Sequence, residues 1–335
     1  MASDFTRREL IAAAPFVLAA PALARAAAPD PATWRFLVVG DWGRGGREDQ
    51  VRTAQAMALV AERENTEFVV STGDNVYRWG LWSKTDPRWD ASYARVYAES
   101  LGPWYSVLGN HDYGGSVDAQ IWHGTRGRRF NMENRWYPKR LQAPGRPTVD
   151  LFFFDTVAWQ GRESFPFQLW GSKMDAATQA EQEREMTRAL ASDAPVKLAF
   201  GHHGIYSIGE HGGKPGLDGL DKLLRANGVK AWVSGHDHCL YHVEHDGMHY
   251  VCSGAGSEVL GAYKGGPGQC ALTQPCDGVG EDAAKQPVWR SFYRKRPGTP
   301  EHIDGGFALF ELGAASGSFQ FYDSKATPLK GGVLY

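Results

Sequence analysis

Five short polar motifs, each directly after an apolar run, constrain the fold of this chain more than any other feature. They read Gly40-Asp41-Trp42-Gly43, Gly73-Asp74-Asn75-Val76-Tyr77, Gly109-Asn110-His111-Asp112, Gly201-His202-His203 and Gly235-His236-Asp237-His238. Short continuous apolar runs are typical of strands buried on both faces of a sheet. One such dipeptide would carry little information, but five in this order are hard to obtain by chance. Together they offer ligands for two metal ions.

The apolar pattern predicts an α/β fold. Strands are expected at 34–39, 67–71, 104–108, 151–154, 197–200 and 230–233, helices at 51–61, 174–191 and 217–226, and hairpin strands at 240–245, 248–253, 307–312 and 319–322. Alternating strands and helices followed by hairpins favour a layered sandwich with two mixed β-sheets flanked by helices. No break in composition divides residues 34–335, which indicates one domain. Residues 112–148 and 261–300 read as long irregular loops, expected to line a substrate cleft.

The N-terminus resembles an export signal. Arg7-Arg8 precedes an apolar, Ala-rich stretch at 11–23, and an Ala-x-Ala cleavage site follows at 24–26 or, as a second choice, at 22–24. This order is typical of a twin-arginine signal peptide. We therefore expect residues 1–26 to be removed on export by the twin-arginine machinery, leaving a catalytic domain over 27–335. A membrane anchor is the alternative, but the stretch is shorter than the ~20 residues of a membrane span.

The expected mature protein is periplasmic or secreted, with no stable membrane association. The net charge of -2 and the absence of a Lys/Arg run argue against a nucleic-acid partner. Four cysteines are too few for a disulfide scaffold. Cys270 and Cys276 flank a Gly/Pro-rich loop that a disulfide would close, with a bridge and free thiols equally expected. Cys239 and Cys252, on consecutive strands, either face each other or pack as free thiols.

The residue types in the motifs suit a pair of unlike metal ions. Two cations ~3.5–4 Å apart need a bridging carboxylate and serve in-line displacement at phosphorus. Asp74 is the natural bridge, and Asp41 would serve the first ion. Asn110 offers a neutral amide oxygen suited to a divalent ion. Tyr77 is the informative member: phenol has a pKa near ~10, so it binds as phenolate only beside a strongly Lewis-acidic cation, which favours iron(III).

These motifs resemble those of the purple acid phosphatases, within the metallophosphoesterase superfamily. The likeness is greatest to the small, mammalian-type tartrate-resistant enzymes, extends from about Phe36 to Tyr322, and includes Ser207-Ile208-Gly209-Glu210-His211-Gly212. The resemblance implies a four-layer sandwich and acid phosphatase activity. It also implies iron(III) bound by Asp41, Asp74, Tyr77 and His238, and a divalent ion (Fe, Zn or Mn) bound by Asp74, Asn110, His202 and His236. His111 and His211 match the family's catalytic histidines, which bind phosphate and assist the leaving group.

The chain departs from the mammalian-type pattern at His203-Gly204, where an aromatic residue and a proline are expected. His203 follows a ligand on a strand end, so we expect it to point to the opposite face and not to bind metal. Asp112 either orients a histidine or caps a turn. The stretch 159–175 shows little likeness to the family's regulatory loop. His123, His242, His245, His249 and His302 are expected to have structural or solvated roles.

The predicted function is hydrolysis of small phosphate monoesters by in-line attack of a metal-bound hydroxide. His111 or His211 would act as imidazolium, which favours acidic medium. Two alternatives remain: a phosphodiesterase or nucleotide hydrolase on the same metal centre, and a redox-active iron protein with incidental hydrolysis.

Overall fold

The structure is a computed structural model of the chain. It describes residues 30–335 apart from residues 128, 158–175, 214 and 262–287. The predicted signal peptide, the stretch compared with the regulatory loop and the pair Cys270 and Cys276 lie outside the described residues. Cys239 and Cys252 are buried free thiols. No helix in the described ranges is both long and apolar enough to cross a membrane.

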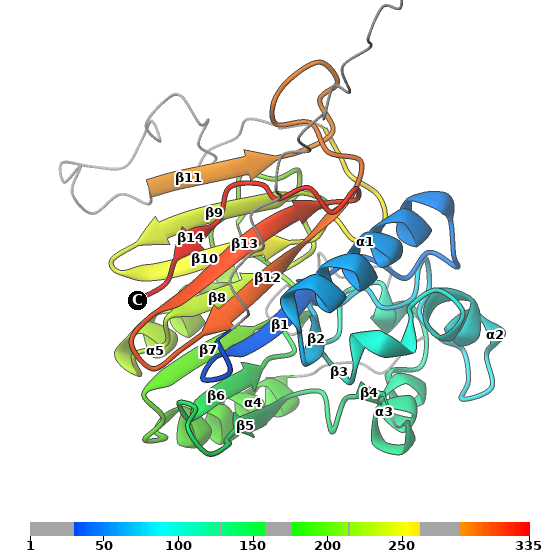
Figure 1. The fold of residues 1–335 in the computed structure, drawn as a ribbon. Coiled ribbons are helices and arrows are strands. Elements are labelled where there is room, and N and C mark those ends of the chain that lie inside the picture. The colour runs from blue at the N-terminus through cyan, green and yellow to red at the C-terminus, as the bar shows by residue number, and fades with distance from the viewer. Residues whose placement is uncertain (1–29, 128, 158–175, 214, 262–287) are drawn as a thin grey trace, which may run out of the picture.

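The described strands form two seven-stranded mixed sheets (Figure 1). The first has the order β14-β13-β12-β1-β2-β3-β4, with β1 to β4 parallel. Its strands are β1 (Trp34–Val39), β2 (Phe68–Ser71), β3 (Trp104–Ser106), β4 (Phe130–Asn131), β12 (Gly306–Leu312), β13 (Gly317–Asp323) and β14 (Gly332–Val333). The second has the order β11-β9-β10-β8-β7-β6-β5. Its strands are β5 (Tyr137–Leu141), β6 (Val149–Phe153), β7 (Val196–Phe200), β8 (Ala231–Ser234), β9 (Leu240–His245), β10 (Met248–Ser253) and β11 (Val288–Tyr293).

Helices cover the outer faces of both sheets and complete a four-layer sandwich (Figure 1). Helix α1 (Glu48–Glu64) packs on the first sheet, with Met57 and Val60 in the common core. Helices α4 (Ala176–Leu190) and α5 (Asp218–Ala226) pack on the second sheet through Met186 and Leu224. The short α2 (Pro87–Trp89) and α3 (Val117–Arg126) lie near β4 at one edge of the first sheet.

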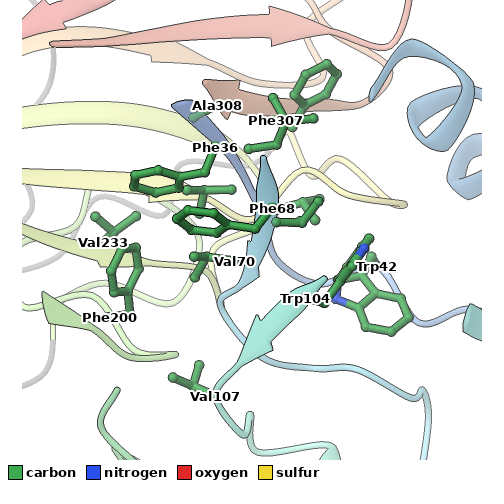
Figure 2. Close-up of a cluster of buried hydrophobic side chains, with 14 of the residues drawn as sticks. Phe36, Trp42, Phe68, Val70, Trp104, Val107, Phe200, Val233, Phe307 and Ala308 are labelled. Atoms are coloured by element: carbon green, nitrogen blue, oxygen red, sulfur yellow. The ribbon is translucent and has the colours of Figure 1, made fainter. Parts of the chain in front are cut away.

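The two sheets share an aromatic core. Phe36 of β1 stacks on Phe68 of β2 at 4.6 Å and on Phe310 of β12 at 5.4 Å, measured between ring centroids. It also meets Phe200 of the second sheet edge-on at 6.4 Å (Figure 2). Offset and edge-to-face pairs of this kind stabilise a core by about 0.5–1.5 kcal/mol each beyond the area they bury. The strand ends that carry the motifs therefore start from a rigid base.

The four-layer fold and the predicted strands are confirmed, with strand boundaries that differ by at most two residues. The expectation of an irregular loop over 112–148 is wrong, because that range contains helix α3 and strands β4 and β5. Ser116 caps α3 by accepting a hydrogen bond from the Ala119 amide, a signal that the surrounding Gly, Pro and Arg residues obscure. Strand β11, paired antiparallel with β9, likewise lies inside the second expected loop.

Candidate metal centre

The five motifs meet where the parallel strands of the two sheets end. Within the first sheet, the Asp41 amide donates to the Gly73 carbonyl at 3.0 Å. Within the second, the Gly235 amide donates to the His202 carbonyl at 3.0 Å. The sheets are joined directly, because His202 Nδ1 lies 2.8 Å from the Thr72 carbonyl oxygen. Carboxyl ends of parallel strands are the usual place for a ligand site in α/β folds, and here two sheets contribute to one site.

Three candidate ligands have left-handed backbone conformations, which L-residues other than glycine adopt uncommonly. The φ angles are 59° at Asp41, 53° at Asp74 and 68° at His236. Such strain clusters at functional sites. Gly73 shows why the motifs need glycine: a Cβ there would lie 2.8 Å from His202 Nδ1 and 2.8 Å from the Gly109 amide nitrogen. These sharp turns direct the three side chains away from the strand axes and toward the metal centre.

One half of the centre gathers Asp41, Tyr77 and His238. The Tyr77 hydroxyl lies 3.0 Å from Asp41 Oδ1 and 3.0 Å from His238 Nε2. His238 Nε2 is 3.5 Å from the same Asp41 oxygen. Tyr77 and His238 come from different sheets and are 161 residues apart in sequence. The arrangement therefore brings an oxygen-rich donor set together around Tyr77.

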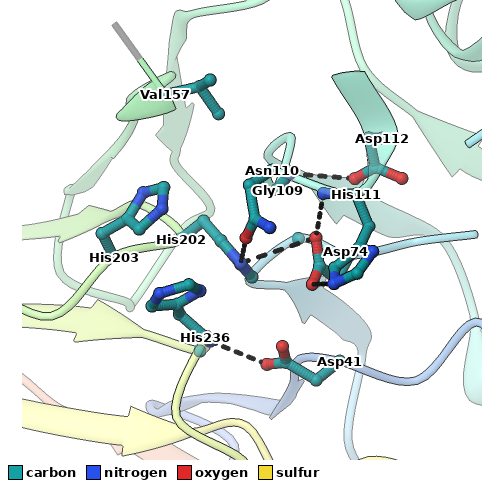
Figure 3. A network of polar contacts seen from close by, with 12 residues as sticks. Asp41, Asp74, Gly109, Asn110, His111, Asp112, Val157, His202, His203 and His236 are labelled. Atoms are coloured by element: carbon teal, nitrogen blue, oxygen red, sulfur yellow. Dashed lines mark hydrogen bonds and ion pairs between the residues drawn. The ribbon is translucent and has the colours of Figure 1, made fainter. Parts of the chain in front are cut away.

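The other half gathers Asn110, His202 and His236 beside Asp74 (Figure 3). His202 Nε2 lies 3.1 Å from Asn110 Oδ1 and 3.5 Å from Asp74 Oδ1. The rings of His202 and His236 are 5.0 Å apart. One ligand atom from each of Asp41, Asp74 and His202 falls within 4.8 Å of the others. Asp74 thus lies between the two halves, where a bridging carboxylate is required.

The hydrogen bonds of this group fit a bound cation. A carbonyl only accepts, so His202 Nδ1 carries a proton for Thr72, and the other ring nitrogen, Nε2, faces the oxygens of Asn110 and Asp74. That contact is repulsive unless a proton or a metal ion lies between the atoms. His238 Nδ1 is also buried, with no hydrogen-bond partner among the described residues. Two carboxylates, a phenol, an amide oxygen and imidazoles form a suitable donor set for two cations.

The pKa values of the acidic residues also indicate that the site needs a bound cation. Burial raises the pKa of Asp41 to about 8. His202 opposes this shift, and the neighbouring Asp74 carboxylate adds to it. Burial and then Asp41 hold the pKa of Tyr77 well above its usual value. Burial also opposes ionisation of Asp74, but His202 and His111 bring its pKa below the usual value. The chain alone thus disfavours the phenolate and one carboxylate, and a multivalent cation would restore both charges.

His111 and His211 lie at the border of the buried centre. The His111 ring is 4.4 Å from Tyr77, its Nδ1 donates to the Arg78 carbonyl at 2.8 Å, and its Nε2 lies 3.9 Å from Asp74 Oδ2. The His211 ring is 4.3 Å from that of His236. The structure therefore brings all nine predicted site residues together. Both border histidines are at least partly accessible to solvent, whereas Asp41, Asp74 and His202 are buried.

Asp112 connects two of the ligand-bearing turns. Its buried carboxylate accepts from the amides of Asn75 at 3.1 Å, Val76 at 3.1 Å and Gly109 at 2.9 Å, and from Gln120 Nε2 at 2.7 Å. Its described contacts include no histidine. Of the two roles predicted for Asp112, a structural role is the one its contacts support, although it spans two turns rather than capping one.

Two neighbouring residues were not singled out from the sequence. Asp237 accepts from the His211 amide at 2.9 Å and from Ser207 Oγ. Arg44 lies over the Tyr77 ring, 4.0 Å from its centroid. Asp237 could have been suspected because it stands between two predicted ligands, whereas nothing in the sequence marks Arg44.

The predicted orientation of His203 is wrong. Its ring lies 4.9 Å from that of His202 and 4.4 Å from that of His236, on the same side as the metal centre (Figure 3). Alternation of side chains applies to extended strands. Strand β7 ends at Phe200, and the backbone bends at His202 and His203, so both rings turn the same way.

The sequence is similar to those of known phosphoesterases. The calcineurin-like phosphoesterase family matches residues 35–240. Purple acid phosphatase 3 of Arabidopsis thaliana is 40% identical over 245 residues, which cover 70% of this chain and 65% of that protein. The chain therefore spans slightly less than two thirds of that relative. Tartrate-resistant acid phosphatase type 5 of Rattus norvegicus is 35% identical over 255 residues, covering 72% of this chain and 77% of that protein.

The fold is shared with a solved structure described as GAP50, the anchor in the inner membrane complex of Plasmodium. The TM-score is 0.72 at 23% identity, over 90% of this chain and 89% of that one. This likeness concerns the fold alone, whereas the family match over residues 35–240 spans all five motifs. The resemblance drawn from the motifs is confirmed: the chain belongs to the calcineurin-like phosphoesterases and, within them, to the purple acid phosphatases.

Proposed function

We propose that this chain is an exported acid phosphatase that hydrolyses phosphate monoesters at a dinuclear metal centre. One observation carries the proposal. The Tyr77 hydroxyl, Asp41 Oδ1 and His238 Nε2 converge at 3.0–3.5 Å on one side of Asp74, while Asn110 and His202 converge on the other. The family relation supports phosphate-ester hydrolysis as the activity of this centre.

The donor types support unlike ions on the two sides. Asp41, Asp74, Tyr77 and His238 would hold iron(III), because phenolate binds to a hard, strongly Lewis-acidic cation. Asp74, Asn110, His202 and His236 would hold a divalent ion (Fe, Zn or Mn), because their donors are neutral except for the shared carboxylate. Formal charges of about +5 from the cations and -3 from Asp41, Asp74 and Tyr77 leave a positive centre that attracts a phosphate dianion.

When bound, the cations supply Lewis acidity at phosphorus and lower the pKa of the attacking water. The chain supplies the proton donors. Because His111 Nδ1 donates to the Arg78 carbonyl, the ring orientation is fixed and the Nε2 edge faces the region of Asp74. In the imidazolium form, Nε2–H binds a phosphate oxygen or passes its proton to the ester oxygen as the P–O bond breaks. His211, packed against His236, can do the same from the other side.

Export is supported by the sequence alone. The paired arginines, apolar stretch and Ala-x-Ala site at residues 7–26 fit a cleaved twin-arginine signal, and the mature protein would act in the periplasm or outside the cell. Substitution of Lys for both Arg7 and Arg8 tests this: the variant should remain in the cytoplasm with its N-terminus intact.

The purified mature protein tests the activity proposal directly. Elemental analysis should find two metal ions per chain, one of them iron, and an aryl phosphate should be hydrolysed faster than a bis-aryl phosphate. The Asn110→Ala variant should lose the divalent ion and at least tenfold in kcat, because a supporting or direct ligand contributes that much. Full activity after removal of all metal, or in Asn110→Ala, would overturn the proposal. A faster reaction with the diester would favour phosphodiesterase activity.

A further inference from the structure

The structure places three imidazoles, rather than two, on the divalent-ion side of the centre. One ring nitrogen from each of His202, His203 and His236 lies within 4.8 Å of the other two. The ring of His203 is nearer to His236, at 4.4 Å between centroids, than the ring of His202 is, at 5.0 Å. Because His202 and His236 are the histidines proposed to bind the divalent ion, His203 lies where a third nitrogen donor would be.

The surroundings of His203 fix its ring in that position. His203 is 1% exposed. Its Nδ1 lies 2.8 Å from Thr156 Oγ1, and its carbonyl accepts from Trp232 Nε1 at 3.1 Å. Thr156 Oγ1 also accepts from the His203 amide at 3.2 Å. A hydroxyl oxygen has two acceptor lone pairs, so it can accept hydrogen bonds from both the amide and Nδ1–H of His203. In that tautomer the lone pair of the ring is on Nε2, which is then the atom that would bind a metal ion. Metal-binding histidines are commonly oriented in this way by a bond from the second ring nitrogen.

We propose that His203 is an additional nitrogen ligand of the divalent metal ion, and that it makes this position selective for Zn²⁺ over Mn²⁺. The inference rests on the dinuclear centre proposed above. With His203, the donor set becomes two oxygens, from Asp74 and Asn110, and three imidazole nitrogens. Imidazole suits zinc and iron, whereas carboxylate, carbonyl and water ligands suit manganese. A third nitrogen therefore strengthens the binding of Zn²⁺ more than that of Mn²⁺.

The test compares wild type with His203→Phe, which retains an aromatic ring at a buried position but removes the donor. Both proteins, purified in mature form and loaded with iron(III), are titrated with Zn²⁺ or Mn²⁺ against a chelating dye. We expect His203→Phe to weaken Zn²⁺ binding by more than about tenfold and Mn²⁺ binding by a smaller factor. X-ray absorption at the zinc edge should detect three imidazoles in wild type and two in the variant. Two imidazoles in wild type, or unchanged selectivity, would overturn the inference.

Two further variants keep the outcome interpretable. His123→Phe makes the same substitution at a ring stacked on Trp89, outside the centre, and should leave both metal affinities unchanged. Thr156→Val retains His203 but removes the hydroxyl that orients it, and should reduce Zn²⁺ selectivity if His203→Phe does not fold. Failure of iron-loaded wild type to bind a second ion would count against the dinuclear proposal and so against this inference. Binding of a second ion with equal Zn²⁺ selectivity in all variants would reject the role of His203 alone.

Discussion

Asp112→Asn tests whether one buried carboxylate fixes the relative position of two metal-binding turns. Asp112 Oδ1 accepts from the Asn75 and Val76 amides and from Gln120 Nε2, and Oδ2 accepts from the Gly109 amide and the Asn75 side chain. Asparagine has the same shape but replaces one oxygen with an NH₂ group. Whichever oxygen is replaced, a donor then faces at least two other donors. The substitution therefore removes at least two of the hydrogen bonds that hold these turns, without creating a cavity.

The expected cost follows from those contacts. At least two hydrogen bonds to a charged acceptor are lost, each contributing about 1.5–3 kcal/mol, which gives roughly 3–6 kcal/mol. Removal of a buried charge offsets part of this loss. That charge is unfavourable where it lies, since burial and then Asp74 raise the pKa of Asp112 to about 6. We expect a net loss near 3 kcal/mol in the free energy of unfolding, or roughly 5 °C in Tm, because the unfolding entropy of about 300 folded residues is roughly 0.6 kcal/mol/K.

Thermal unfolding of the metal-free proteins provides the assay, because bound metal would add its own contribution to stability. Asp193→Asn is the matched control: its side chain is 90% exposed, and exposed ion pairs contribute little. Asp112→Asn should also bind the divalent ion less tightly than wild type, because Asp74 and Asn110 are carried by the two turns that Asp112 connects. A Tm within 1 °C of wild type would refute the reasoning.

Two further predictions concern the iron ligand and acid stability. Tyr77→Phe should abolish the visible absorption of the iron-loaded protein and weaken iron binding, because the hydroxyl near Asp41 and His238 is lost; an unchanged spectrum would show that Tyr77 is not a ligand. His242 has its pKa lowered from 6.5 to about 3 by burial and then by His249, whose Nδ1 lies 3.0 Å from His242 Nε2. Between pH 6.5 and pH 3 the unfolded chain binds a proton at His242 and the folded protein does not. The free energy of unfolding therefore falls as the pH drops below 6.5, by about 2 kcal/mol at pH 5. His242→Phe should thus lose less Tm than wild type between pH 7 and pH 5, and an equal loss would contradict the assignment.

The positions of the strands along the chain and the clustering of the candidate ligands could be predicted because both depend on short, local signals. Strands β1, β7 and β8 are buried along almost their whole length, so each appears as a continuous apolar run. The ligands stand directly after those runs, where parallel strands of a layered fold must end together. Helix α3 could not be recognised in the same way, since its signal is an N-cap within a region rich in glycine and arginine.

The position of His203 could not be predicted for a different reason. Alternation along a strand is a reliable rule only while the backbone remains extended, and the sequence does not mark the residue at which β7 ends. Asp112 and Asp237 are a related case: each stands beside predicted ligands, but its partners belong to other turns. The amide of His211 reaches Asp237 across 26 residues of sequence. Contacts of this range depend on how the turns pack, and no local pattern encodes them.

The burial of this centre explains why residues other than the candidate ligands are needed to hold its turns in place. Asp41 and Tyr77 lie together beside Asp74, and the negative charges of Asp41 and Tyr77 are unfavourable in the chain alone, as the raised pKa values of these two residues indicate. A folded chain without metal must therefore hold Asp41 and Tyr77 where their charged forms are disfavoured, and left-handed turns at Asp41, Asp74 and His236 add backbone strain. Asp112 and Asp237 counter this by bonding to backbone amides, so they fix the turns without competing for the metal ions. Cation binding then restores the ligand charges within a framework that is already in place, and most of its free energy remains available for affinity rather than for ordering the chain.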